Sequence, residues 1–196
     1  VYTEFLAALK ARAASIIIGD PLDPTSEMGP MATQPQLALV ERMVAEALAD
    51  GAKLIQGGKR ASIAGEGWYY EPTILAVENN ECSIMQEEVF GPVASIMRFK
   101  DEAEALALAN DTEFGLAAGI WTRDNARVHR MSKAVQAGII WVNTYRVVSP
   151  MGAIGGYKAS GYGRESGIDG VKDYTQLKTV WMNTSSEPMA DPFVMR

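Results

Sequence analysis

Apolar residues recur at helical spacing in two segments within the first fifty residues. The first pattern predicts a helix over residues 3–17, and the run Gly19-Asp20-Pro21-Leu22-Asp23-Pro24 then stops it. A capping pattern at Thr33-Gln34-Pro35-Gln36 predicts the start of a second helix, which Gly51 ends. The stripe that this second helix is expected to bury consists of Leu37, Val40, Met43, Val44, Ala47 and Leu48.

β-branched and aromatic residues gather in short stretches farther along the chain. They predict strands over residues 53–56, 68–76, 93–99, 116–122 and 139–142. The last stretch is wholly apolar, which is typical of a strand covered on both faces. Helices that begin at Asp101 and Asp124 are expected between the later strands. Because strands alternate with helices, the sequence predicts an α/β fold with a layered, parallel-type sheet and flanking helices.

The composition is that of an ordinary globular domain, with 196 residues of which 47% are hydrophobic and 21% charged. A net charge of −6 without a basic stripe argues against nucleic acid as a partner. No apolar segment is long enough to span a membrane, and the single cysteine fits a reducing, cytoplasmic location. The N-terminus carries neither an initiator methionine nor a signal sequence, so we expect the chain to be part of a longer protein.

The run Gln86-Glu87-Glu88-Val89-Phe90-Gly91-Pro92 brings two carboxylates, an aromatic ring and a Gly-Pro reversal together. Adjacent side chains point to opposite sides of an extended chain, so at most one of the two carboxylates is expected to enter a site. An ionised carboxylate accepts both hydroxyls of a ribose, and each charge-assisted bond contributes on the order of 1.5–3 kcal/mol. The alternative is that both glutamates are solvated surface charges.

This run, together with Gly155-Gly156-Tyr157-Lys158-Ala159-Ser160-Gly161, resembles the C-terminal part of the aldehyde dehydrogenase superfamily. The resemblance extends from about Val1 to Val180 with its spacings preserved. It includes Gly19-Asp20-Pro21, Met28-Gly29-Pro30, Gly51-Ala52-Lys53, Asn110-Asp111-Thr112-Glu113-Phe114-Gly115-Leu116, Trp141-Val142-Asn143 and Gly161-Tyr162-Gly163-Arg164-Glu165.

The resemblance implies a fold, a reaction and a set of site residues. Residues 1–172 would be a portion of the catalytic domain, residues 173–184 an oligomerisation strand, and residues 185–196 a loose tail. The parent enzyme would oxidise a small aldehyde to a carboxylic acid with NAD or NADP, as a homo-oligomer. Glu88 would bond the nicotinamide ribose, and Phe90 would pack near the nicotinamide. Val148 and Ile154 would line the aldehyde tunnel at positions where many relatives carry aromatics, although packing alone would also explain these aliphatic residues.

A catalytic nucleophile is missing from the sequence. The family's F-x-N-x-G-Q-x-C motif is absent, and Cys82 follows Asn79-Asn80-Glu81, whose negative charge disfavours a thiolate. The chain is therefore expected to hold no catalytic residue and to be inactive alone. His129 is the only histidine, and no ligand cluster predicts a metal site. Gln36 lies where some relatives contact the cofactor, but a role in the helix start explains it equally well.

Gly161-x-Gly163 is not a dinucleotide fingerprint, because Ser166 stands at the last glycine position and no strand precedes it.

Two other interpretations remain open at the level of sequence. The chain could instead be a non-catalytic oligomerisation module, since the β-prone tail around Trp181 would seek a partner strand. An acylating, coenzyme-A-dependent relative would share the fold but not the hydrolytic ending of the reaction.

Overall fold

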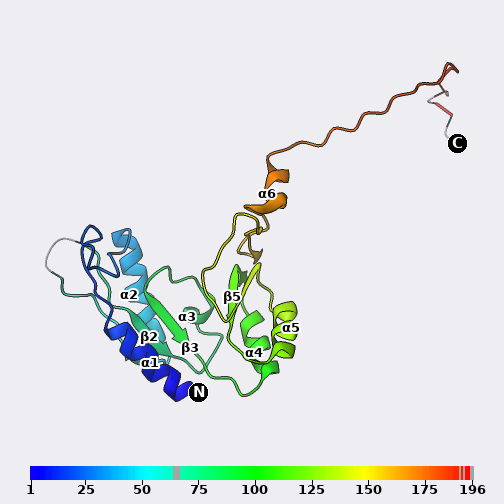
Figure 1. Ribbon diagram of the computed structural model, residues 1–196. Helices are drawn as coiled ribbons and strands as arrows, with labels where there is room; N and C mark the ends of the chain where they lie inside the picture. The colour runs from blue at the N-terminus through cyan, green and yellow to red at the C-terminus, as the bar shows by residue number, and fades with distance from the viewer. Residues whose placement is uncertain (64–66, 190, 192, 195–196) are drawn as a thin grey trace.

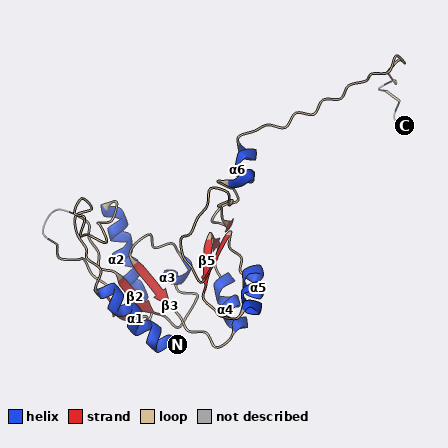
Figure 2. Ribbon diagram, viewed as in Figure 1, coloured by secondary structure: helices blue, strands red, loops and turns tan. Residues whose placement is uncertain are grey.

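The computed structural model describes residues 1–63, 67–189, 191 and 193–194. Its first part packs two helices against a three-stranded sheet of order β1-β2-β3 (Figures 1 and 2). β1 runs antiparallel to β2, whereas β2 and β3 are parallel, with Thr73 opposite Val93. The elements of this part are α1 (Tyr2–Ala14), α2 (Gln34–Ala49), β1 (Lys53–Gln56), β2 (Thr73–Ala76) and β3 (Val93–Ile96).

α2 supplies most of the hydrophobic core. The predicted stripe is confirmed from Leu37 to Ala47, whereas Leu48 is 37% exposed at the end of the helix. Leu75 of the central strand is completely buried in the same cluster. The predicted helix start is also confirmed, since the Thr33 hydroxyl accepts a hydrogen bond from the Gln36 amide at 3.3 Å.

The second part of the chain forms two small two-stranded sheets flanked by helices. β5 and β6 are parallel, and β4 and β7 are antiparallel. Figure 1 shows α4 and α5 beside β5, and α3 between the two parts. The elements are α3 (Ser83–Gln86), α4 (Glu102–Asn110), β4 (Phe114–Gly115), β5 (Ala117–Ile120), α5 (Asn125–Ala134), β6 (Ile139–Val142), β7 (Tyr157–Lys158) and α6 (Gly167–Asp173).

Both predicted helix starts in this part are confirmed. The Asp101 carboxylate accepts from the Glu104 amide at 2.9 Å, and Asp124 caps α5 in the same manner. Glu102 joins the two helices by accepting from Arg130 and Arg127, which lowers its pKa to about 2. Because this pKa lies below its ordinary value of 4.5, the ion pairs stabilise the fold above that pH and are lost as the pH falls toward 2.

The predicted α/β fold with parallel strand pairs and flanking helices is confirmed, but some of its strands differ in detail. The described strands form three small sheets, and two of these sheets contain an antiparallel pair. The strand predicted over residues 68–76 begins only at Thr73, because Pro72 has no N–H to donate to a ladder. β6 is half-buried along its length instead of being covered on both faces. The short helices α3 and α6 were not predicted.

The segment after α6 extends away from both parts of the molecule (Figure 1). No strand is assigned within the described part of this tail, where Trp181 is 93% exposed. α6 ends at Asp173, the first residue of the predicted oligomerisation strand. The oligomerisation strand itself stays a prediction. Within the described ranges, no helix combines the length and the apolar character needed to cross a membrane.

Candidate functional site

The candidate site is the turn over residues 87–92, which connects α3 to β3. Both of its ends are anchored by backbone hydrogen bonds, from the Glu87 amide to the Ser83 carbonyl and from the Thr73 amide to the Pro92 carbonyl, each 2.8 Å long. Between these ends Phe90 adopts a positive φ of 47°. A non-glycine residue in this region costs about 1–3 kcal/mol, so the surroundings must hold the turn in place.

Glu88 and Phe90 both present their side chains to solvent. The Phe90 ring is 73% exposed, and Glu88 is also exposed. Among the residues that the structure describes, none hydrogen-bonds to the Glu88 carboxylate. An unengaged acceptor and an exposed aromatic ring, two residues apart on one turn, can receive a diol and a flat ring.

The turn is tied to the N-terminal end of α2. The Gln36 side-chain amide donates to the Val89 carbonyl at 2.8 Å and to the Phe90 carbonyl at 3.1 Å. Gly91 packs so closely against Val40 that a side chain would overlap it. The sequence leaves two interpretations of Gln36 open, a cofactor contact implied by the resemblance and a role in the helix start. Neither includes this contact with the turn, which spans more than fifty residues.

The other end of the turn is linked to residues 155–163, here called the glycine-rich segment, through the connection that follows α4. Gln86, the last residue of α3, donates from its side chain to the Asp111 carbonyl at 2.8 Å. From the opposite side the Lys158 ammonium donates to the carbonyls of Asn110 at 2.6 Å and Thr112 at 2.9 Å. Residues 110–112 therefore join the two segments that carried the family resemblance.

The predicted tunnel residues lie on the loop that follows β6. Asn143 fixes the beginning of this loop by exchanging two 2.9 Å side-chain hydrogen bonds with the backbone of Thr122. The Trp141 indole donates to the Val147 carbonyl at 2.8 Å. Val148 is 63% exposed, whereas Ile154 is half-buried and pairs with Glu165 through two backbone hydrogen bonds.

The four predicted site residues thus occupy two separate loops. The structure brings Glu88 and Phe90 onto one turn, but no hydrogen bond between described residues joins that turn to Val148 or Ile154. Ile154 lines a cavity of about 480 Å³ with the glycine-rich segment, and Val148 is not among its lining residues. Their roles toward cofactor and aldehyde stay predictions.

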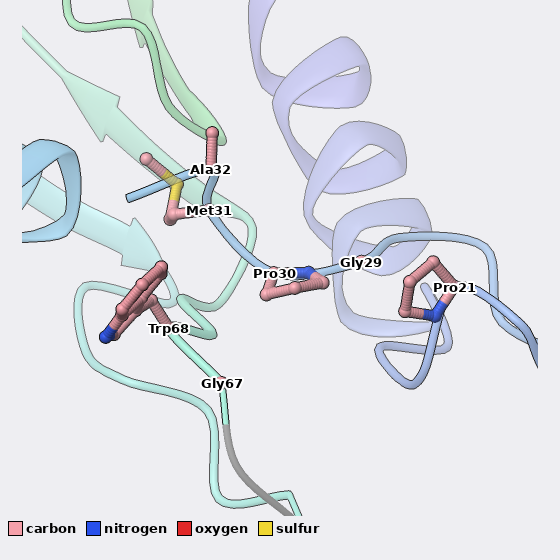
Figure 3. A pocket seen from close by; sticks show the side chains of 7 residues that line it. All are labelled: Pro21, Gly29, Pro30, Met31, Ala32, Gly67 and Trp68. Carbon is pink, nitrogen blue, oxygen red and sulfur yellow. The ribbon is translucent and has the colours of Figure 1, made fainter. Parts of the chain in front are cut away.

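A cavity of about 810 Å³ lies beside the segment that connects α1 to α2 (Figure 3). Its lining contains no titratable side chain, and its walls include Pro21, Pro30 and the Trp68 ring. Met31 lies at this cavity and also close to Gly91 of the candidate turn. The apolar lining offers packing surface rather than acid–base chemistry, and Met31 is the residue that links it to the turn.

Cys82 and His129 are two further residues that could suggest other chemistry. The half-buried Cys82 thiol donates to the Asn79 carbonyl at 3.0 Å and packs against the core, as a structural cysteine does. His129 is exposed on α5. The described part of the chain contains no group of three or more histidine, cysteine, aspartate or glutamate residues that could hold a metal ion.

Residues 1–180 match the model of the aldehyde dehydrogenase family, and the chain belongs to this family. It is 46% identical over 194 residues to (Z)-2-((N-methylformamido)methylene)-5-hydroxybutyrolactone dehydrogenase of Acinetobacter baylyi, covering 98% of this chain and 39% of that protein. It is 42% identical over 190 residues to betaine aldehyde dehydrogenase 1 of Rhizobium meliloti, covering 96% of this chain and 39% of that protein. The chain thus spans well under half the length of these relatives.

Solved structures show the same fold. PnpE from Pseudomonas sp. WBC-3 is 41% identical with a TM-score of 0.92, over 98% of this chain and 39% of that chain. A double mutant of betaine aldehyde dehydrogenase from Staphylococcus aureus, solved with NAD+, is 33% identical with the same TM-score and coverage. The predicted aldehyde dehydrogenase catalytic-domain type of fold is confirmed.

Proposed function

We propose that this chain supplies the nicotinamide-ribose contact and part of the substrate tunnel of an NAD(P)-dependent aldehyde dehydrogenase, which oxidises an aldehyde to a carboxylic acid. The observation that carries the proposal is the Glu88 carboxylate, which is exposed beside Phe90 on a turn held in place from α2. Family membership supports the reaction. The relative solved with NAD+ supports NAD as the cofactor, with NADP as the alternative.

Glu88 and Phe90 would bind and orient the cofactor. The Glu88 carboxylate would accept hydrogen bonds from the ribose hydroxyls, and the Phe90 ring would cover one face of the nicotinamide. When bound, the cofactor supplies hydride acceptance. The contribution of these residues is orientation, which lowers the barrier by holding the reacting atoms in line.

The substrate is proposed to be a small aldehyde whose path passes the loop after β6. Val148 and Ile154 would give this path an aliphatic rather than an aromatic lining. The same loop is held at Asn143 and at Ile154, so its ends are fixed while its middle is exposed. We place the protein in the cytoplasm, because its single cysteine suits a reducing compartment.

The chain alone is predicted to form no NADH from aldehyde and NAD+, because it carries no cysteine motif for the nucleophile. Activity is expected once the missing part is restored. A suitable chimera replaces the matched 190-residue segment of Rhizobium meliloti betaine aldehyde dehydrogenase 1 with this chain. Absorbance of NADH with betaine aldehyde as substrate measures both cases. Turnover by the chain alone, or a folded chimera without turnover, would contradict the proposal.

The tail provides a second test, because it is expected to pair with another subunit. Tyr174, Leu177 and Trp181 are all strongly exposed, and an unpaired β-prone segment of this kind favours association. The full chain is predicted to be a dimer or larger, and a chain that ends at residue 173 is predicted to be monomeric. Light scattering during gel filtration measures both masses. If particles of the two samples contain the same number of chains, the role of the tail is refuted.

The same exposed tail favours the second candidate, a non-catalytic oligomerisation module. The two candidates differ in what the chimera does. A module would restore the assembly of the chimera without contributing to turnover, so substitutions at Glu88 would leave catalysis unchanged. The enzyme proposal requires the opposite result.

A further inference from the structure

The candidate turn requires contacts that keep Phe90 in its left-handed conformation. A phenylalanine at a φ of 47° is disfavoured, because its Cβ crowds the backbone there. Packing of the Phe90 ring contributes little to holding this conformation, because the ring is mostly exposed. The restraint must therefore come from contacts with the backbone of the turn.

Gln36 makes these contacts. Both protons of its side-chain amide are used, one toward the Val89 carbonyl at 2.8 Å and one toward the Phe90 carbonyl at 3.1 Å. Gln36 is itself fixed, because its backbone amide donates to the Thr33 cap in the first turn of α2. The side-chain amide of Gln36, held in place by the start of α2, thus donates hydrogen bonds to two consecutive carbonyls.

We propose that Gln36 is a positioning residue that holds the Glu88–Phe90 turn in its cofactor-binding conformation through the two amide protons of its side chain. This inference rests on the proposed function for its catalytic meaning, but the restraint itself is a property of the chain alone. It differs from a direct contact with the cofactor, because both amide protons are donated to the turn and only the side-chain oxygen is left for another partner. The side-chain oxygen is not needed for the restraint.

Two substitutions separate the donor group from the acceptor group. Gln36→Glu keeps the shape and the acceptor oxygen but replaces both donors with a carboxylate that repels the two carbonyls. Gln36→Met keeps the length and removes all polarity. Gln34→Glu is the matched control, because it puts the same charge into the first turn of α2 at an exposed side chain. Gln34→Glu therefore shows the effect of a negative charge near the N-terminus of α2 without loss of the two hydrogen bonds.

A glutamate-specific protease tests the restraint on the full 196-residue chain. Cleavage after Glu88 requires local opening of the turn, so its rate reports how firmly the turn is held. We expect this rate to rise roughly tenfold to thirtyfold in Gln36→Glu and Gln36→Met, because two hydrogen bonds are lost. Cleavage after Glu165 is the internal reference and should not change. Gln34→Glu should behave as the unsubstituted chain, and unchanged cleavage after Glu88 in both Gln36 variants would overturn the proposal.

The KM values of the chimera for NAD+ and for betaine aldehyde distinguish a positioning role from a merely structural one. Both Gln36 variants are expected to raise the KM for NAD+ about tenfold, while the KM for betaine aldehyde stays the same. If the KM for NAD+ is normal in Gln36→Glu and rises only in Gln36→Met, the side-chain oxygen of Gln36 accepts a hydrogen bond directly from the cofactor. The positioning role is then wrong. If cleavage accelerates but neither KM changes, the restraint is real and the cofactor role of the turn, hence the proposed function, is overturned.

Discussion

Glu88→Gln is expected to lower kcat/KM for NAD+ in the chimera by roughly tenfold to a hundredfold. Glutamine keeps the size of the side chain but removes the charge, and only one of its two polar atoms accepts hydrogen bonds. The unsubstituted carboxylate makes no hydrogen bond to the described residues, so its full acceptor capacity is available to the ribose. Initial rates at varied NAD+, with betaine aldehyde held at saturation, measure the effect.

Glu87→Gln is the matched control for this prediction. Glu87 is adjacent, also exposed and carries the same charge, so a general electrostatic effect of the turn would appear equally in both variants. We expect the Glu87 variant to stay within about twofold of the unsubstituted chimera, because exposed charges contribute little. Equal losses in the two variants, or no loss in either, would show that Glu88 is not the ribose contact.

Gly138→Ala is expected to destabilise the second part of the chain by roughly 3 kcal/mol or more. Gly138 lies just before β6, and its amide donates to the Gly115 carbonyl at 3.0 Å. An added Cβ would overlap the carbonyl oxygen of Gly155, which is backbone and cannot rotate away. The glycine-rich segment would have to leave β6. Urea unfolding followed by tryptophan fluorescence measures the loss, since Trp141 lies in that strand.

Gly163→Ala provides the control within the same segment. A Cβ at Gly163 would meet no atom within 4 Å, and its φ is not in the left-handed region. This variant should unfold at nearly the same urea concentration as the unsubstituted chain. If Gly138→Ala is as stable as Gly163→Ala, the close approach of the glycine-rich segment to β6 is not a feature of the folded protein.

Local sequence signals predicted the starts of three capped helices, although α1 ends at Ala14 rather than at residue 17 and the short helices α3 and α6 were missed. The Thr33, Asp101 and Asp124 caps each act within three residues of their own position, and all three are confirmed. The buried stripe of α2 follows from a period of 3.6 residues, which depends on that helix alone. In both cases the physics that decides the outcome lies within a short window of sequence.

Strand pairing was less predictable, because it depends on residues far apart in the chain. Nothing near Lys53 indicates that β1 runs antiparallel to β2 while β3 runs parallel to it. The contact of Gln36 with Val89 and Phe90 is of the same long-range kind, and a capping role already explained that residue. Glu88 and Phe90 lie on one exposed turn, and their roles, which are implied by the resemblance, stay predictions.

The most direct test is a crystal structure of the chimera with NAD+ bound. The account predicts both ribose hydroxyls of the nicotinamide half within hydrogen-bonding distance of the Glu88 carboxylate, about 2.5–3.0 Å between oxygens, with the Phe90 ring against the nicotinamide. A nicotinamide ribose bound elsewhere, with Glu88 directed into solvent, would contradict it.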